Sequence, residues 1–198
     1  MRTRDGNTRN LLIEAAYHVL AENGYEATSI KDIAREAGVS PGLVHYYFSN
    51  KEELLTAVVK EATDEYCNQM EQLQKSVVGD KLASAALAEP MQRVRTHSDW
   101  YRLRYEMFVL GLRNEHIQPS VRELLEKGRE GVEETLQAIA GSSFDDAGEL
   151  SAILIACFDG LALQALMDPN FDLEKAYAVL REMGMGLLAS KVESLKKD

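Results

Sequence analysis

Cysteine is scarce in this chain, and the scarcity excludes two kinds of stabilising site. Cys67 and Cys157 are the only cysteines among the 198 residues, which is too few for a disulfide framework, and they lack the spacing of a metal site. We therefore expect both to be small buried side chains rather than redox switches. No metal ion and no cofactor are expected.

Long apolar runs and targeting signals are also missing. No stretch of some 18 consecutive apolar residues occurs, so the sequence predicts no membrane span and no membrane partner. The first ten residues, MRTRDGNTRN, have no apolar segment behind their charges, which a secretory signal would need. A cytoplasmic protein is the simplest expectation.

Neither catalytic motifs nor strand patterns are found. The chain has no H-E-x-x-H, no G-x-S-x-G, no P-loop and no acidic pair at an identifiable site, so we do not expect an enzyme. No segment alternates with the two-residue period of a strand, whereas apolar residues recur at helical spacing along the whole chain. The predicted fold class is all-α, with about nine helices.

The charge is unevenly distributed. The net charge is −10, yet residues 1–51 carry six basic and six acidic side chains, so the whole excess lies in residues 52–198. This asymmetry indicates two regions with different partners. An acidic body opposes phosphates, so any non-specific affinity for DNA should be modest.

Residues 28–53 predict two short helices joined by a tight turn. Thr28 is a suitable N-cap for the first helix, and Gly38 is suited to end it because glycine tolerates a left-handed backbone. Between them an apolar stripe runs at helical spacing. Its members are Ile30, Ile33, Ala34 and Ala37.

The second of these helices begins at Ser40, a good N-cap, followed by Pro41 at the first helical position. Val44 and Phe48 can face inward, and Tyr47 suits either inward packing or a phosphate contact. The remaining positions, Gly42, Leu43, His45 and Tyr46, form a polar and aromatic face. This is the layout of a helix-turn-helix, although an ordinary helical hairpin with satisfied surface groups has the same local pattern.

A resemblance covers the first quarter of the chain. Residues 38–54, G-V-S-P-G-L-V-H-Y-Y-F-x-N-K-E-E-L, and the preceding T-S-I-K-D-I-A-x-x-A resemble the signature of TetR-type transcriptional regulators. Leu11–Gly24 resembles the first helix of that family. The family often has Tyr-His-Tyr-Phe where this chain has His-Tyr-Tyr-Phe at 45–48, a difference that bears on base preference. The resemblance implies a three-helix DNA-binding head at residues 1–50 and an effector-binding, dimerising body at 51–198.

DNA contacts are predicted from the same segment. Phosphate contacts are expected near the helix starts and near Gly42, and base-edge contacts from Leu43, His45 and Tyr46. The full predicted set is Thr28, Ser40, Pro41, Gly42, Leu43, His45, Tyr46, Tyr47 and Lys51.

Helical patterns continue to the end of the chain, at about 51–75, 98–114, 119–140, 145–168 and 172–190. Val78-Gly79-Asp80 marks a break, and Gly141-Ser142-Ser143 and Asp168-Pro169 mark turns. Residues 82–97 are poorly defined, because Pro90 is expected to divide an alanine-rich piece from another turn or two of helix.

The last two helices are predicted to form a dimer interface. They are apolar around more than one face, so they can cover the body and also pair with a second copy in a four-helix bundle. The segment F-D-G-L-A-L-Q-A-L-M-D-P also resembles the dimer-forming helix of TetR-type proteins; the alternative is that all of these residues are monomer core. The predicted interface residues are Leu154, Cys157, Leu161, Leu180, Met183, Gly184 and Leu187.

An effector site is implied by the same resemblance. Aromatic and methionine side chains concentrate in the middle of the chain, and such walls suit a hydrophobic or flat small molecule, unless these residues are simply core. Arg104, if it points inward, would suit an anion. The predicted set is Tyr66, Met70, Trp100, Arg104, Met107, Phe108 and Phe158.

Together these features predict a ligand-responsive transcriptional repressor. A homodimer would bind a pseudo-palindromic double-stranded DNA operator and be released by a small-molecule effector. Two alternatives remain open: an activator with the same fold, and a helical module that binds a ligand or a protein but does not read DNA.

Overall fold

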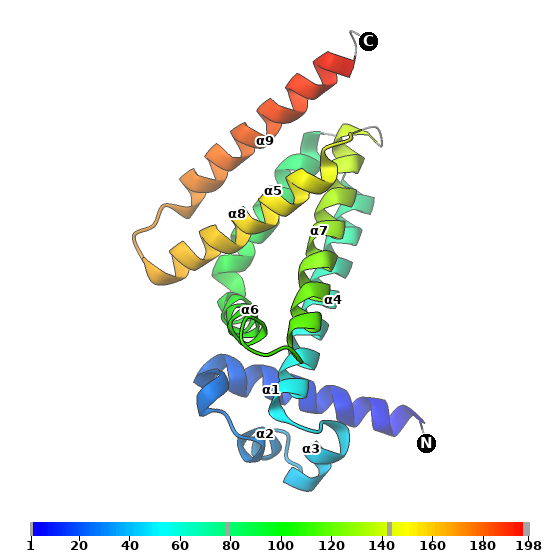
Figure 1. Cartoon of the computed structure of the whole chain (residues 1–198), viewed down its shortest axis with the longest axis vertical. Helices are drawn as coiled ribbons and strands as arrows, with labels where there is room; N and C mark the ends of the chain where they lie inside the picture. The colour runs from blue at the N-terminus through cyan, green and yellow to red at the C-terminus, as the bar shows by residue number, and fades with distance from the viewer. Residues whose placement is uncertain (1, 78–79, 142–143, 196–198) are drawn as a thin grey trace. The chain divides into compact units, whose positions relative to one another are not determined.

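The computed structural model describes residues 2–77, 80–141 and 144–195. Within these ranges it contains nine α-helices and no strand, so the all-α prediction is confirmed. The predicted break at 78–80 and turn at 141–143 fall largely outside the described residues. The helices are α1 (Arg2–Ala27), α2 (Ile30–Glu36), α3 (Pro41–Tyr47), α4 (Lys51–Ser76), α5 (Asp80–Thr96), α6 (Ser98–Gly111), α7 (Gln118–Ala140), α8 (Ala147–Met167) and α9 (Leu173–Leu195) (Figure 1).

The chain forms two compact units. The head unit consists of Met1–Glu65 and Asp99–Leu124, and the body unit of Tyr66–Ser98 and Leu125–Asp198. Helix α6 therefore belongs to the same unit as the helix-turn-helix, although it lies about 50 residues further along the sequence. The domain boundary expected after residue 50 stays a prediction.

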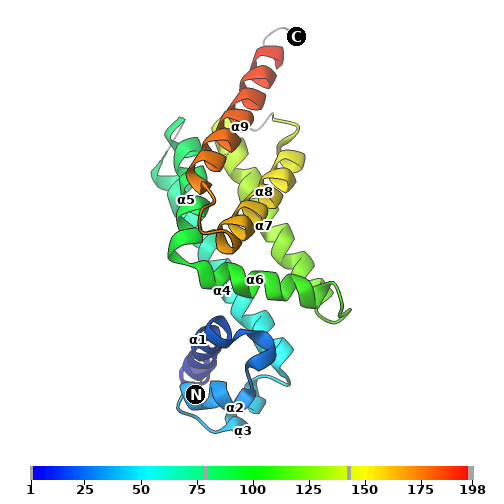
Figure 2. The ribbon, with the colours of Figure 1, turned by 90° about the vertical axis from the view of Figure 1, so that its left-hand side faces the viewer.

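In the head unit, α2 packs against α1, and α3 packs against α2 (Figure 2). Helix α1 is broken at Gly24, whose φ of 78° and ψ of 166° are not helical, so the expected end of the first helix at this glycine is confirmed. A cluster of buried apolar side chains joins these helices. Among its most deeply buried members are Leu12, Ala16, Leu20, Ile33, Val44, Phe48, Leu54 and Leu55.

The same core extends to α6. Leu103 and Met107 are almost completely buried in it, together with Ile117 and Leu124 from the chain that follows. Apolar burial of about 1.5–3 kcal/mol for each such side chain holds α6 to the core of the head unit. The head unit therefore includes a helix that is remote in sequence from the helix-turn-helix.

In the body unit, α5, α8 and α9 pack against one another. The prediction that Pro90 divides the segment 82–97 is wrong, because α5 runs without interruption from Asp80 to Thr96 with Pro90 inside it. A proline inside a helix removes one backbone hydrogen bond. Packing of α5 on two neighbouring helices outweighs that loss, and local sequence cannot show such packing.

Candidate DNA-binding, effector and dimer sites

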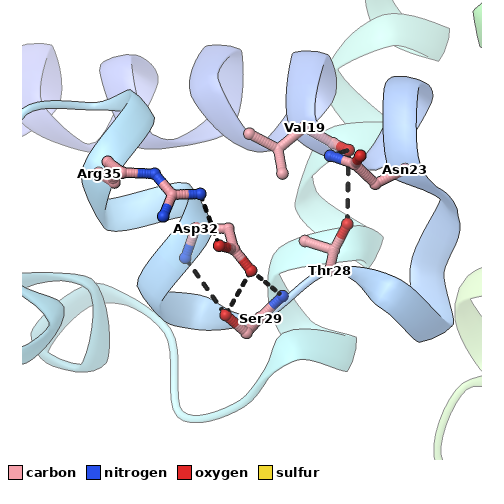
Figure 3. A network of polar contacts seen from close by, with 6 residues as sticks. All are labelled: Val19, Asn23, Thr28, Ser29, Asp32 and Arg35. Atoms are coloured by element: carbon pink, nitrogen blue, oxygen red, sulfur yellow. Dashed lines mark hydrogen bonds and ion pairs between the residues drawn. The ribbon is translucent and has the colours of Figure 1, made fainter.

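The helix-turn-helix begins with a capping box at the start of α2. Ser29 Oγ accepts from the Asp32 N–H at 3.3 Å, and Asp32 Oδ2 accepts from the Ser29 N–H at 3.0 Å and from the Ser29 hydroxyl at 2.5 Å (Figure 3). Arg35 donates to Asp32 Oδ1 at 2.7 Å. The Ser29 hydrogen bonds, followed by the charge of Arg35, lower the pKa of the Asp32 carboxyl below its ordinary value of 3.8.

The N-cap expected at Thr28 is wrong by one residue. Thr28 is buried, and its hydroxyl points back to α1, where it donates to the Gly24 carbonyl at 2.8 Å and lies 3.4 Å from the Val19 carbonyl (Figure 3). Two adjacent hydroxyl residues offer the same capping chemistry. The Thr28 hydroxyl is used by the carbonyls of α1, and Ser29 caps α2.

The turn and the second helix form as expected. Gly38 adopts a φ of 66°, the left-handed region that favours glycine, and so ends α2. Ser40 Oγ accepts from the Leu43 N–H at 3.3 Å, and Pro41 takes the first helical position of α3. The predicted cap and stop signals are confirmed at these positions.

Helix α3 has one buried face and one exposed face. Val44 and the following Phe48 are at most 1% exposed, and half-buried Tyr47 packs against the same core. Tyr46 is 73% exposed and contacts the Tyr47 ring edge-on, with the centroids 5.0 Å apart. The outward face therefore carries Pro41, Gly42, His45 and Tyr46, with Leu43 half-buried beside them.

Gly42 lies on this outward face with free space around it. A Cβ at this position would meet nothing closer than Ser40 Oγ, at 3.9 Å. Packing inside the protein therefore gives no reason for a glycine here. A surface that must approach another molecule closely does give one.

Lys51 lies where α4 begins, and its ammonium is used inside the head. It donates to the carbonyls of Tyr25 and Thr28, at 2.5 and 2.8 Å, and lies 4.0 Å from the centroid of the Tyr25 ring. These contacts hold the turn before α2. Thr28 and Lys51, both in the predicted DNA-binding set, thus make hydrogen bonds within the head unit. Lys31 and Arg35, which were not in that set, are exposed on α2.

Three predicted effector residues come together on α6. Arg104 is 3% exposed, and its guanidinium carbon lies 5.2 Å from the Trp100 ring centroid and 4.7 Å from that of Phe108. Such stacking suits a buried guanidinium. Met107, the fourth predicted residue on this helix, packs into the apolar core of the head unit.

The other predicted effector residues belong to the body unit. Phe158 stacks on Tyr177 with centroids 6.0 Å apart, and Met70 is buried. Tyr66 lies under the guanidinium of Arg93, 4.0 Å from its ring centroid, and burial raises the pKa of its hydroxyl.

Sequence reasoning missed the polar group around Arg93. This side chain is buried and donates to Glu89 Oε1 at 2.6 and 3.0 Å and to Gln69 Oε1 at 3.1 Å. Glu89 and Arg93 are four residues apart on α5, a spacing that brings opposite charges together on a helix. That spacing was the available signal, but it does not reveal burial.

The predicted dimer residues divide into three sets by exposure. Leu154 and Leu180 are buried, Cys157, Leu161 and Gly184 are half-buried, and Met183 and Leu187 are exposed. Large apolar side chains that were not predicted, Ile153, Met167 and Val179, are between 49% and 73% exposed on the same two helices. An exposed apolar surface of this kind is typical of an interaction site.

Helix α8 also has the length and apolar composition of a membrane span, the one such helix among the residues that the structure describes. This is weak evidence, because an apolar helix that packs inside a protein has the same composition.

The comparisons with known proteins agree with this architecture. The model of bacterial regulatory proteins of the tetR family matches residues 12–58, and the model of the tetracyclin repressor-like C-terminal domain matches residues 79–189. The fatty acid metabolism regulator protein of Bacillus subtilis is 39% identical over 74 residues, which are 36% of this chain and 38% of that relative. The chain thus aligns with well under two thirds of that relative's length.

Two solved structures share the fold. FadR from Bacillus subtilis, solved in complex with stearoyl-CoA, is 23% identical with a TM-score of 0.68, and the match covers 87% of this chain and 95% of that one. A transcriptional regulator from Saccharomonospora viridis, solved with choline, is 20% identical with a TM-score of 0.74, over 89% and 95% of the two chains. Because the two family models together account for most of the sequence, this chain belongs to the TetR family of bacterial transcriptional regulators.

Proposed function

We propose that this protein is a homodimeric transcriptional repressor that a small effector releases from DNA. The observation that carries this proposal is the exposed face of α3, a helix capped by Ser40. The side chains of His45 and Tyr46 project from this face, and Gly42 leaves free space beside its first turn. A recognition helix needs this division, with one face fixed by the core and the other free to enter the major groove.

The outward residues suit two kinds of DNA contact. Gly42 allows the backbone of the first turn of α3 to approach a phosphate, and Ser40 and Tyr47 can donate to phosphate oxygens. His45 and Tyr46 can hydrogen-bond base edges, and Leu43 can contact a thymine methyl group. Such a short helix reads few base pairs, so two copies would bind half-sites with centres about 34–36 Å apart.

The exposed apolar residues of α8 and α9 support the dimer. Met183, Leu187 and their newly identified neighbours Ile153 and Val179 would meet the second copy, whereas Leu154 and Leu180 pack within the body unit. An isologous contact of two helices from each copy makes a four-helix bundle and presents two recognition helices. The protein would act in the cytoplasm, where its operator lies.

The effector is proposed to be small and mainly hydrophobic. Trp100, Arg104 and Phe108 offer two aromatic rings and a buried cation on one helix, a set that suits an apolar ligand with an anionic group. The stearoyl-CoA and choline complexes show that relatives of this fold hold very different ligands. Release of DNA requires a coupling free energy of about 1–3 kcal/mol between the two sites.

Selection of bound duplexes from a random DNA library, with the mass of the complex measured in parallel, tests this function. We expect enrichment of an inverted repeat bound by a dimer. A folded protein that enriches no sequence at low salt would instead indicate a helical ligand-binding module that does not read DNA.

A matched pair of variants locates the contact. Gly42→Glu places a carboxylate on the outward face of α3 and should abolish operator binding while the fold and the dimer persist. Gly131→Glu adds the same charge on α7, at a glycine whose Cβ would meet nothing within 4 Å, and should bind like the wild type. Equal binding by both variants would contradict our placement of the recognition helix.

A further inference from the structure

The interruption of helix α1 at Gly24 leaves the backbone N–H of Tyr25 without a helical acceptor. The non-helical φ and ψ of Gly24 turn the chain away from the α1 axis, and Tyr25 is the first residue after the turn. Helix breaks and helix starts leave N–H groups without helical acceptors, and a buried one must find another partner. Tyr25 is 7% exposed, so water is not a sufficient partner.

A carboxylate from α6 supplies the acceptor. Glu106 Oε2 accepts from the Tyr25 N–H at 2.7 Å across 81 residues of sequence. Glu106 Oε1 lies 3.1 Å from the position that a Cβ on Gly24 would take, so the carboxylate sits directly against the break. A hydrogen bond to a charged acceptor is among the stronger contacts of a protein.

The opposite side of the same segment is held by Lys51. Its ammonium donates to the carbonyls of Tyr25 and Thr28, the residue just before the capping box of α2. The entry to the helix-turn-helix is thus held between an anion on its N–H side and a cation on its carbonyl side. Glu26 and Glu52 are the other acidic groups that act on this site.

We propose that Glu106 is the positioning residue through which α6 sets the start of the helix-turn-helix and hence the orientation of α3. The proposal rests on the function proposed above and names the contact by which that site is regulated. Because Trp100 and Arg104 lie on the same helix, a ligand that moves α6 would also move the carboxylate that holds Tyr25.

The groups around Glu106 indicate that its carboxylate has a structural role. Burial raises the pKa of Glu106, opposed by the Tyr25 hydrogen bond and then by Lys51, while the charge of Glu26 raises it further. Burial and the nearby charge of Glu26 both disfavour the ionised carboxylate at this position. The contact with the Tyr25 N–H accounts for its position.

The test compares Glu106→Ala and Glu106→Gln with Asp99→Ala. Asp99 is on the same helix and forms an exposed ion pair with Arg102, so its replacement removes the same charge away from the break. Two quantities are measured in the whole 198-residue chain: the hydrogen-exchange rate of the Tyr25 amide, and the affinity for the operator recovered by the duplex selection.

Glu106→Ala should speed hydrogen exchange at the Tyr25 amide about tenfold or more. It should weaken operator affinity by a similar factor, because a smaller fraction of the molecules then has α3 in the orientation that binds DNA. Glu106→Gln keeps an oxygen acceptor and should recover most of both quantities. Asp99→Ala should match the wild type in both. This rescue by glutamine separates a positioning role from a general effect of charge.

Unchanged Tyr25 exchange and unchanged operator affinity in Glu106→Ala would overturn the proposal. If the alanine variant does not fold, the test depends on the glutamine variant. Wild-type Tyr25 exchange and wild-type operator affinity in Glu106→Gln would support the role of the oxygen acceptor. Losses in Glu106→Gln as large as those expected for alanine would contradict that role. If the wild type binds no duplex at all, the proposed function fails, whereas the exchange of Tyr25 still reports whether Glu106 holds the break.

Discussion

At the scale of single residues, glycine has two distinct uses in the head unit. Gly24 has a backbone conformation that is essentially restricted to glycine, and it is needed for the fold. Gly42 lies in a regular helix with open space beside it, so the fold does not require it. The sequence predicts a helix end at Gly24 and a close approach at Gly42, but the left-handed backbone of the first and the open space at the second appear only in the structure.

Gly24→Ala should lower the free energy of unfolding by about 1–3 kcal/mol, the cost of a side chain in this backbone region. Denaturant unfolding measures the change. Gly131→Ala, in a helix with free space, is the control and should be neutral or stabilise the protein by up to about 1 kcal/mol. Equal stability of the two variants would show that the break at Gly24 does not need glycine.

Tyr46 and Ile33 should respond in opposite ways to truncation. Tyr46→Ala removes an exposed side chain and should weaken operator binding by about 1–3 kcal/mol with unfolding unchanged. Ile33→Ala leaves a cavity in the core and should lower stability by about 2–5 kcal/mol. Operator titrations and thermal unfolding of both variants test this contrast, and a large stability loss in Tyr46→Ala would contradict it.

At the scale of secondary-structure elements, local signals located most helices and failed where packing decides. The cap at Ser40, the stop at Gly38 and the start of α4 at Lys51 follow from residue type. The shift of the first cap from Thr28 to Ser29 could not be predicted, because both hydroxyls can cap a helix. The continuity of α5 through Pro90 depends on contacts with α8 and α9.

Ser29→Ala should destabilise the head by about 1 kcal/mol and alter its pH dependence. The Asp32 pKa is lowered in the folded protein, so this group stabilises the fold above its ordinary pKa of 3.8, and the contribution is lost as the pH falls through the folded value. In Ser29→Ala the Asp32 pKa should rise toward 3.8. NMR titration of Asp32 measures it, and an unchanged pKa would mean that Ser29 is not the cause.

At the scale of the whole molecule, the acidic excess and the exposed apolar surface both lie outside the helix-turn-helix. Residues 1–51, which include the predicted DNA-binding face, are neutral, while the acidic excess of residues 52–198 limits non-specific attraction to phosphates. In the function proposed above, specificity depends on presenting two recognition helices together, so the state of assembly would be part of that function.

Met183→Glu should convert the proposed dimer to a monomer and weaken binding to an inverted repeat strongly, because each half-site then binds alone. The side chain is 67% exposed in one copy, so the monomer should stay folded. Sedimentation and operator titration measure the two effects. Gln92→Glu, which adds a charge at an exposed site on α5, is the control; a dimeric Met183→Glu would contradict the proposed interface.

The sequence by itself determined what depends on near neighbours along the chain. Helical periodicity, the caps and the turn glycine place the helix-turn-helix and its outward residues, because hydrogen bonds and backbone preferences act over three or four residues. Tertiary structure alone decided which side chains far apart in sequence meet. The pairing of Glu106 with Tyr25, the burial of Arg93 and the division of the α8 and α9 leucines into buried and exposed sets result from packing between helices, which no local pattern encodes.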